Sequence, residues 1–452
     1  MREVLVERSL PRFAAARAAA ALAGAAGGVA VAPLRLAERE QRPLPGPDWH
    51  HVTPLLSGIC GSDLSTVDGA SSRYFEPIVS FPFVLGHEIV GMVDDGPLAG
   101  SRVVVEPVLG CLARGIVPPC PACAAGRKGA CERIGFGHLA PGLQTGYCAD
   151  TGGGWSDGLV AHASQLHRVP DELADDAAVM VEPTACAVHA ALLGAVQPGE
   201  RAVVLGSGTL GLTTLAALRH HAHPGALLVV AKHPVQREMA AALGADQVVR
   251  PDELERAVRR LTTSLALARG RSTSRLTGGA DVVFDCVGSS SSLASSLAVV
   301  RPGGRVVLVG MPGTLHVDLA PLWQREIALL GAYAYGAEQT PDGVRSTFDL
   351  AFELVAAAGL ERLVSARYPL ERYQEAVRHA GNAGRRGAVK VVFEIGRATS
   401  PAWRGRGPAP ASPAPANPAP ASPVPANPAP TSPVPANPVA ANPTPESLET
   451  NA

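Results

Sequence analysis

The sequence predicts an α/β protein with a doubly wound parallel sheet and a second, β-rich part. Between about residues 189 and 331, apolar runs such as "RAVVLG", "ALLVVA" and "DVVFDCVG" alternate with helical patterns such as "LGLTTLAALRHH". That alternation is typical of a parallel sheet covered by helices. Before about residue 183, short apolar runs separated by Gly- and Pro-rich loops favour a β-rich domain. With 452 residues, 46% of them hydrophobic, the chain can form both cores.

These patterns divide the chain into four parts. Residues 1–188 are predicted to form the β-rich domain and residues 189–331 the parallel-sheet domain. Helical patterns and a closing apolar run follow, so residues 332–397 are expected to return to the first domain. Residues 398–452 are a Pro/Ala repeat that cannot form a core, and we expect a disordered spacer. A docking segment for a partner that reads proline-rich helices is the alternative.

Charge excludes some classes of partner. The chain has 39 Lys plus Arg against 40 Asp plus Glu, so no strong field favours nucleic acid or an anionic membrane, and a small molecule is the expected partner. The N-terminal stretch "RFAAARAAAALAGAAGGVAV" is too short and too weakly apolar for a membrane span, and it predicts a surface or domain-packing helix. A cytoplasmic location is expected, in which thiols stay reduced.

A glycine pattern follows the first strand of the parallel-sheet domain. In "RAVVLGSGTLGLTTLAAL" the glycines have the spacing G-x-G-x-x-G between a strand and a helix, where helix amides bind a pyrophosphate. A strand-helix turn that binds nothing is the alternative. The residues expected to contact a dinucleotide here are Gly206, Ser207, Gly208, Thr209, Leu210 and Gly211.

The end of the next strand favours NADP over NAD. A site for NAD needs a carboxylate about twenty residues after the glycines, and "ALLVVA" is followed instead by Lys232 and His233. Lys232, with His233 or Arg237, could bind the 2′-phosphate of NADP. Alternatively, Lys232 is solvated and the site does not discriminate.

Two groups of residues could bind metal. "GICGSD", "GHEIVG" and "VEPTACAVHA" supply the mixed set Cys60, His87 and Glu182, a donor set that suits catalytic zinc. Separately, each has an ordinary structural explanation as a buried thiol, a core histidine or a helix N-terminal acid. The second group is Cys111, Cys120, Cys123 and Cys131, which suits a closed structural zinc site better than a thioredoxin-like redox pair.

The order and spacing of these motifs resemble the zinc-dependent medium-chain dehydrogenases/reductases, in particular the alcohol, polyol and threonine dehydrogenases. The resemblance runs from about Leu34 to Ile395. It implies a GroES-like catalytic domain joined to a Rossmann coenzyme domain. It also implies a zinc-dependent oxidoreductase that transfers a hydride between a secondary or primary alcohol and a nicotinamide dinucleotide, and it favours alcohols of polyol, sugar or amino-alcohol type. Relatives of this kind are homo-oligomers, which we therefore expect here.

The resemblance also implies roles for individual residues. Cys60, His87 and Glu182 would bind the catalytic zinc, and Glu88 would lie next to the metal, either behind its ligands or as an exchanging ligand. Asp63 would orient His87, and Ser62 would receive the proton of the substrate alcohol. Relatives carry a histidine three residues after this serine for the outer proton relay. This chain has Ser65 there, which leaves that relay unassigned.

The remaining implied positions lie in the cysteine segment and in the coenzyme domain. Relatives bind a structural zinc with the spacing C-x2-C-x2-C-x7-C. Cys120, Cys123 and Cys131 match its last three positions, whereas the first is Val117 and Cys111 lies six residues upstream of it. A longer first loop costs little, so Cys111 remains the expected fourth ligand. The loops expected to cross the nicotinamide contain Val287, Gly288, Gly310 and Met311.

Two other functions remain open at this point. The first is a non-catalytic zinc- and NADP-binding sensor or scaffold. The second is a zinc-free quinone reductase of the same fold, against which the complete metal set argues. Tyr74, Phe75 and Trp323 are candidate walls of a substrate pocket, with ordinary core packing as the alternative.

Overall fold

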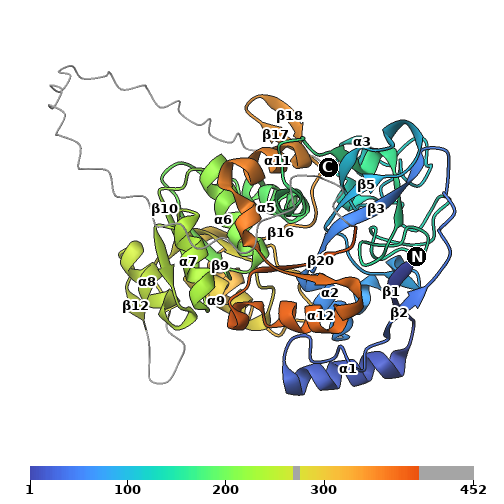
Figure 1. Cartoon of the computed structure of the whole chain (residues 1–452). Helices are drawn as coiled ribbons and strands as arrows, with labels where there is room; N and C mark the ends of the chain where they lie inside the picture. Colours follow the sequence, from blue (N-terminus) through green and yellow to red (C-terminus); the bar gives the residue numbers. More distant parts are fainter. Residues whose placement is uncertain (268–274, 397–452) are drawn as a thin grey trace, which may run out of the picture. The chain divides into compact units, whose positions relative to one another are not determined.

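A computed structural model of the chain describes residues 1–267 and 275–396. The described residues form one compact unit. The tail predicted to be a spacer lies outside the described residues. The described part contains a parallel sheet with its helices and a β-rich part, as the sequence predicts (Figure 1).

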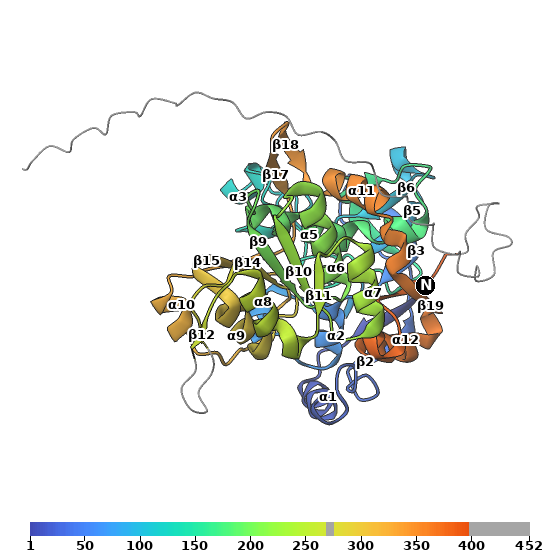
Figure 2. The same ribbon diagram turned by 90° about the vertical axis from the view of Figure 1, so that its left-hand side faces the viewer.

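The parallel sheet has six strands in the order β11-β10-β9-β14-β15-β16, and every pairing in it is parallel. The chain starts in the middle, at β9, and winds outward in both directions, as expected for a dinucleotide-binding sheet. Figure 2 shows the strands from β15 and β14 at the left to β10 and β11. The strands are β9 (Arg201–Leu205), β10 (Ala226–Val230), β11 (Gln247–Val249), β14 (Ala280–Asp285), β15 (Val300–Leu308) and β16 (Ala328–Gly331). The connecting helices are α6 (Thr209–His221), α7 (Pro234–Ala242), α8 (Leu254–Leu261), α9 (Ser290–Val299) and α10 (Ala320–Gln324), with a small hairpin of β12 (Ala266–Leu267) and β13 (Arg275–Leu276).

The β-rich part is built on a seven-stranded sheet that draws strands from both ends of the chain. Its order is β19-β20-β3-β5-β6-β8, and β7 also pairs with β3. These strands are β3 (Trp49–Gly58), β5 (Ile89–Val93), β6 (Arg102–Val105), β7 (Leu159–His162), β8 (Leu166–Arg168), β19 (Val364–Pro369) and β20 (Lys390–Glu394). The smaller sheets consist of β1 (Arg2–Val6), β2 (Leu34–Glu38) and β4 (Phe83–Val84), and of β17 (Ala337–Thr340) with β18 (Gly343–Ser346). Strand β20, late in the described chain, pairs with β3 of the β-rich part.

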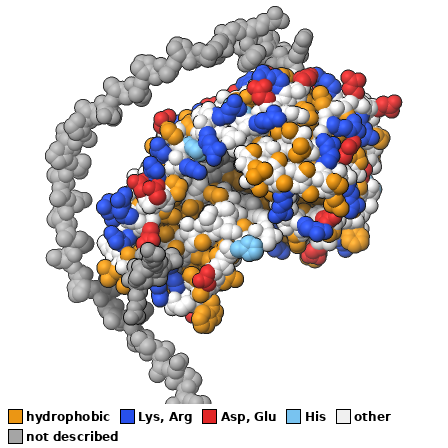
Figure 3. Space-filling view, turned by 90° about the horizontal axis from the view of Figure 1, so that it is seen from below, with side chains coloured by type: hydrophobic (Ala, Val, Ile, Leu, Met, Phe, Trp, Pro, Cys, Tyr) orange, Lys and Arg blue, Asp and Glu red, His pale blue; other side chains and the backbone are white. Residues whose placement is uncertain are grey.

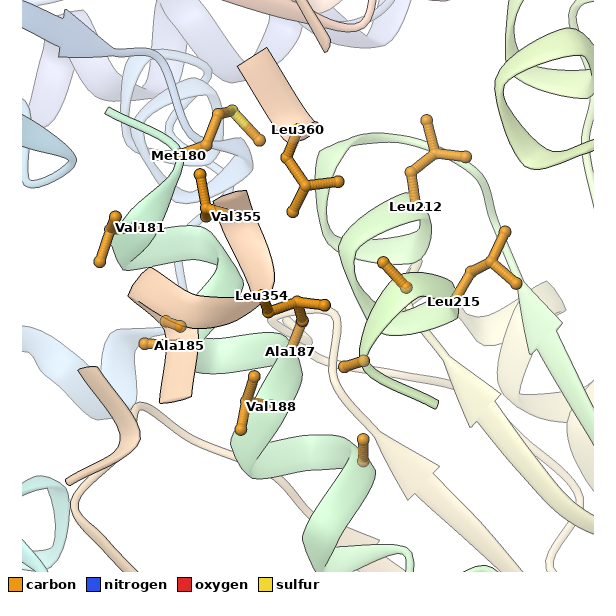
Figure 4. Close-up of a cluster of buried hydrophobic side chains, with 14 of the residues drawn as sticks. Met180, Val181, Ala185, Ala187, Val188, Leu212, Leu215, Leu354, Val355 and Leu360 are labelled. Atoms are coloured by element: carbon orange, nitrogen blue, oxygen red, sulfur yellow. The ribbon is translucent and has the colours of Figure 1, made fainter. Parts of the chain in front are cut away.

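One buried cluster joins the two parts. It contains side chains of α5, α6 and α11 together with strand residues of both large sheets, such as Val90 and Val204 (Figure 4). In Figure 4 Leu212 and Leu215 of α6 and Leu354 and Val355 of α11 lie around α5. The helices outside the parallel-sheet part are α1 (Leu10–Ala23), α2 (Gly61–Val67), α3 (Pro121–Ala124), α4 (Asp175–Ala178), α5 (Val181–Leu193), α11 (Thr347–Ala358) and α12 (Tyr373–Gly381).

The N-terminal helix α1 is a surface helix, as predicted. Ala16 is its buried residue, while Leu22 is 91% exposed. In both ribbon views α1 lies beneath α2 (Figures 1 and 2). The chain after α1 is fixed by Asp68 at the end of α2, whose carboxylate accepts hydrogen bonds from the backbone N–H groups of Ala26 and Gly28 at 2.7 and 3.0 Å. Among the described helices, none is long and apolar enough to cross a membrane.

Candidate active site

The start of α2 positions the first predicted site residues. Cys60 caps the helix, and its backbone N–H donates to Asp63 Oδ2 at 2.9 Å. A carboxylate in the first turn of a helix is stabilised by the helix dipole and by this reciprocal capping. Asp63 is fully buried. The local sequence "CGSD" therefore holds the thiol, the hydroxyl of Ser62 and the carboxylate in one turn.

His87 meets this turn from the loop before β5. It is buried, its Nδ1 atom lies 3.4 Å from Asp63 Oδ1, and its Nε2 atom lies 3.4 Å from Ser62 Oγ. Neither Nδ1 nor Asp63 Oδ1 has another partner among the described residues. Burial alone would lower the pKa of His87, but the charges of Asp63 and Cys60 outweigh it and raise that pKa well above its ordinary value. The imidazole is thus oriented by a carboxylate behind it, the arrangement that metal-binding histidines use.

Glu182 completes the predicted set from the first turn of α5. Its side chain is buried, and Tyr335 donates its hydroxyl hydrogen to Glu182 Oε1 at 3.1 Å. Cys186, one turn further along the helix, directs its thiol at the same oxygen from 3.8 Å. Burial raises the pKa of Glu182 to about 7, with the charge of Glu88 adding to the effect and that of His87 opposing it. Ordinary core packing explains neither the burial of the Glu182 carboxyl group nor the contacts of the Tyr335 hydroxyl and the Cys186 thiol with one of its oxygens.

Glu88 is paired with a buried lysine that the sequence analysis missed. Lys390 of β20 contacts Glu88 Oε2, and both side chains are 1% exposed. Burial would lower the pKa of Lys390, but the Glu88 carboxylate outweighs it and raises that pKa. The pair is held so tightly that a Cβ atom at Gly58 would lie 1.9 Å from Glu88 Oε2, which explains a glycine at this point of β3. Lys390 is 302 residues from Glu88 in the chain, and no local pattern connects them.

A short chain of hydroxyl groups leads away from Ser62. The hydroxyl of Tyr147 lies 3.2 Å from Thr66 Oγ1, which lies 3.2 Å from Ser71 Oγ, and Ser62 is near enough to Tyr147 to affect its pKa. Tyr147 is buried, and burial raises its pKa. The sequence analysis also missed Tyr147, because it lies 81 residues from Thr66.

The predicted coenzyme residues all lie at the carboxyl edge of the parallel sheet. The glycine turn follows β9 and opens α6, and Gly211 packs so closely that a Cβ atom there would lie 1.9 Å from Gly206 O. Gly288 follows β14 and packs against the backbone of Gly310 and Met311, which follow β15. This edge is where an open parallel sheet binds its ligands.

Two side chains fix these loops. Ser207 donates its hydroxyl hydrogen to Val230 O at 2.8 Å, which ties the glycine turn to β10. The fully buried Asp285 accepts the backbone N–H groups of Val287 and Gly288, both at 3.0 Å. Asp285 is a further position that motif reading missed, although its place at the end of a central strand was visible in the sequence.

The four clustered cysteines meet at one point. Their sulfur atoms all lie within 4.8 Å of one another, and those of Cys111 and Cys131 are 3.7 Å apart. Across residues 1–267 and 275–396 this is the one group of three or more candidate ligands with that spacing. The set Cys60, His87 and Glu182 is more open. In the cysteine cluster, the longer loop brings Cys111 to the other three cysteines. Val117, which occupies the position where relatives carry the first cysteine, is 84% exposed.

The three candidate residues for the pocket wall differ in their exposure to solvent. Tyr74 and Trp323 are each 79% exposed, so core packing is wrong as an explanation for either. Phe75 packs partly against a buried cluster. Figure 3 shows one face of the molecule hollowed, with hydrophobic side chains along the hollow and Lys and Arg side chains near its rim.

Comparison with known proteins shows the family of the chain. Residues 46–171 match the family model "alcohol dehydrogenase GroES-like domain", and residues 209–357 match "zinc-binding dehydrogenase". The 2-dehydro-3-deoxy-L-galactonate 5-dehydrogenase of Pseudoalteromonas atlantica is 30% identical over 323 residues, which cover 69% of this chain and 82% of the relative. The chain belongs to the zinc-dependent medium-chain dehydrogenase family. The dehydrogenase is also 28% identical to L-idonate 5-dehydrogenase of Vitis vinifera over 353 residues, 75% of this chain and 86% of the relative. A solved zinc-binding dehydrogenase of Sinorhizobium meliloti bound to NADP superposes with a TM-score of 0.60 at 25% identity, covering 80% of this chain and 95% of that one.

Family membership confirms the predicted fold and enzyme class. The dehydrogenase is a zinc-dependent alcohol oxidoreductase that uses a nicotinamide cofactor and a small-molecule substrate. Its sulfur, imidazole and carboxylate donors are those that zinc prefers, and the orphaned His87 and Asp63 atoms face each other as a ligand and its orienting group would. The residues therefore fit the metal.

Proposed function

We propose that this dehydrogenase oxidises a secondary alcohol of a polyol or sugar derivative, or reduces the corresponding ketone, with NADP as coenzyme. The observation that carries the proposal is that His87 lies 3.4 Å from Ser62 Oγ, with Cys60 and the buried Glu182 near enough for their charges to interact with the imidazole. A carboxylate ligand in place of a thiolate suits a hydroxyl-rich substrate, and the relatives named above act on sugar acids.

In this proposal Cys60, His87 and Glu182 hold the catalytic zinc, which when bound makes the substrate hydroxyl more acidic. Asp63 orients His87, and the Tyr335 hydroxyl orients Glu182. Glu88 lies next to the metal site. Its negative charge, the second buried there after that of Glu182, is balanced by Lys390.

Ser62 Oγ accepts the substrate proton and passes its own to Tyr147. The path then continues through Thr66 Oγ1 to Ser71, which is partly exposed. Each hydroxyl both donates and accepts, so the proton can leave without any group becoming charged for long. This path takes the place of the histidine that relatives carry at the position of Ser65.

The coenzyme occupies the carboxyl edge of the parallel sheet, with its pyrophosphate at the start of α6 and its nicotinamide along Val287, Gly288, Gly310 and Met311. The choice of NADP is supported by the absence of an acid after β10 and by the exposed Lys232 there. The relative solved with NADP bound is consistent with it.

A second zinc is proposed at Cys111, Cys120, Cys123 and Cys131. Four thiolates close a tetrahedral site and stabilise the segment without taking part in turnover. The buried guanidinium of Arg114 lies inside this segment and donates only to backbone carbonyls, so its charge is free to offset that of the thiolates.

We also propose a homo-oligomer and a cytoplasmic location. Strand β16 lies at an edge of the parallel sheet, and Leu329 on it and Trp323 just before it are exposed, which favours pairing with a second copy. None of the eight cysteines forms a disulfide, in agreement with a reducing compartment.

The test is a panel of polyols, sugar acids and simple alcohols with NADP and NAD, alongside zinc analysis. We expect turnover with hydroxyl-rich substrates, with NADP, and two zinc ions per chain. Ser62→Ala should lower kcat by roughly 100-fold or more at unchanged zinc content. Turnover confined to simple hydrophobic alcohols would reject the substrate class, and near-normal turnover of Ser62→Ala would reject the proton acceptor.

A further inference from the structure

Positive charge gathers where β10 ends. Lys232 follows the strand and is exposed, and His233 is the residue before α7. Arg237, one turn into α7, donates from Nη1 to Lys232 O at 3.1 Å. Arg237 therefore stabilises the backbone at Lys232, so these two positive side chains lie on the same short segment.

A third cation comes from the segment that returns after residue 332. The short helix η8 (Ala383–Arg386) packs on α7, and its backbone approaches so closely that a Cβ atom at Gly384 would lie 2.3 Å from His233 Cδ2. The next residue is Arg385. The pKa of His233 is lowered, first by burial and then by the positive charges of Lys232, Arg385 and Arg237.

These charges are not neutralised by the protein. Within residues 1–267 and 275–396, no carboxylate forms an ion pair with Lys232, Arg237 or Arg385. The side-chain hydrogen bonds of the two arginines go to Lys232 O and, at 3.3 Å, to Asn382 Oδ1. Like charges repel, so three cations from two distant segments destabilise this part of the protein electrostatically. An anion bound between them would relieve that repulsion.

We infer that Arg385 is a coenzyme-specificity residue that binds the 2′-phosphate of NADP together with Lys232 and Arg237. The inference rests on the coenzyme choice proposed above. The end of the second strand of such a sheet is where the adenosine ribose places its 2′ position. A doubly charged phosphate fits the forked guanidinium, which can bind two of its oxygens. The selectivity for phosphate is thus shared between the parallel-sheet part and the returning segment.

The chain contains a matched control for Arg385. Arg386 is its neighbour on the same short helix and is also exposed, but its charge acts on His379 of α12 and not on His233. Removing Arg386 changes the net charge of the protein by the same amount without removing a cation from the proposed phosphate site. A general electrostatic effect on nucleotide binding would appear equally in both variants.

The experiment measures binding of NADPH and NADH to the zinc-loaded full-length protein by nucleotide fluorescence, so no substrate is needed. We expect Arg385→Ala to weaken NADPH binding roughly tenfold or more while NADH binding changes by less than about twofold. Arg386→Ala should leave both within about twofold, and Arg385→Lys should recover part of the loss. The titration is repeated with 2′-AMP and 5′-AMP, of which only the former should respond to Arg385→Ala.

The outcomes distinguish a wrong coenzyme choice from a wrong role for Arg385. Wild-type protein that binds NADH as tightly as NADPH overturns the coenzyme choice and this inference with it. If NADPH is preferred, and Lys232→Ala lowers the preference while Arg385→Ala does not, the coenzyme proposal stands and the role of Arg385 is rejected. Equal weakening of both nucleotides by Arg385→Ala assigns the residue to packing, which also overturns the inference.

Discussion

Lys390 is a buried cation with one charged partner, Glu88. Its ammonium group contacts Glu88 and also donates to Ile59 O at 3.4 Å, and neither charged side chain reaches solvent. A buried pair often contributes little net stability, but removing one member leaves the other charge uncompensated.

We therefore expect Lys390→Met to lower the free energy of unfolding by roughly 3 kcal/mol, measured by urea denaturation at neutral pH. Lys390→Arg, which keeps the charge, is the control and should lose less. A methionine variant as stable as wild type would show that the fold does not depend on the charge of Lys390.

Tyr147 is the residue on which the proposed proton path depends. Phenylalanine retains the ring that packs against Phe83 and lacks only the hydroxyl that contacts Thr66 and that the proposed path places after Ser62. We expect Tyr147→Phe to lower kcat by about tenfold, to increase the solvent isotope effect and to leave zinc content unchanged. Ser80→Ala, which removes a nearby hydroxyl outside the path, is the control. Unchanged kcat in Tyr147→Phe would remove the tyrosine from the path.

At the scale of elements, the cysteine segment of residues 111–131 is the part of the structure that the proposed second zinc would hold. Apart from the four-residue helix α3 and a short turn at residues 128–130, it has little regular structure that could hold it without metal. We expect Cys111→Ser to reduce bound zinc from two ions per chain to one and to lower the thermal midpoint. Cys148→Ser, at a buried cysteine outside the cluster, should keep both ions. Two ions in the Cys111 variant would exclude Cys111 as a ligand.

The end of α6 carries a pH-dependent contribution to stability. Burial, with the charge of His220, lowers the pKa of His221 from its ordinary 6.5 to about 4. As the pH falls below 6.5 the unfolded chain takes up a proton that the folded chain resists. The stability associated with neutral His221 is therefore complete above about pH 6.5 and is lost as the pH falls toward 4.

Urea unfolding at pH 7.5 and pH 5 tests this contribution. The loss of stability between the two values should be smaller in His221→Gln than in wild type by on the order of 1 kcal/mol. His223→Asn, at an exposed position two residues away, should behave as wild type does. An equal pH dependence in His221→Gln would show that the histidine is protonated as freely in the folded chain as in the unfolded one.

The elements of the fold differ in how well the sequence predicts them. The strands of the parallel sheet were predictable because each is a local apolar run, and the coenzyme loops because they follow strand ends. The partners of the predicted site residues were not predictable. Tyr335 lies 153 residues from Glu182, and Lys390 lies 302 residues from Glu88. Only the pairing of β20 with β3 and the packing around α5 bring them together.

For the whole molecule, the unpaired side of β16 is the feature that bears on assembly. Within the described residues β16 pairs with β15 alone, so the backbone groups along its other side are free, and Leu329 is 40% exposed beside them. Exposed edge strands with apolar side chains are templates for pairing with another chain.

We expect sedimentation to show a dimer or a larger assembly for wild type and a shift toward monomer for Leu329→Lys, since a charge on the edge opposes pairing. Leu22→Lys on α1, where the leucine is 91% exposed, is the control and should leave the assembly unchanged. Circular dichroism should be the same for all three proteins, because Leu329 is not part of a buried cluster. A monomeric wild type would reject the oligomer, and an assembly that survives Leu329→Lys would place its interface on another surface than β16.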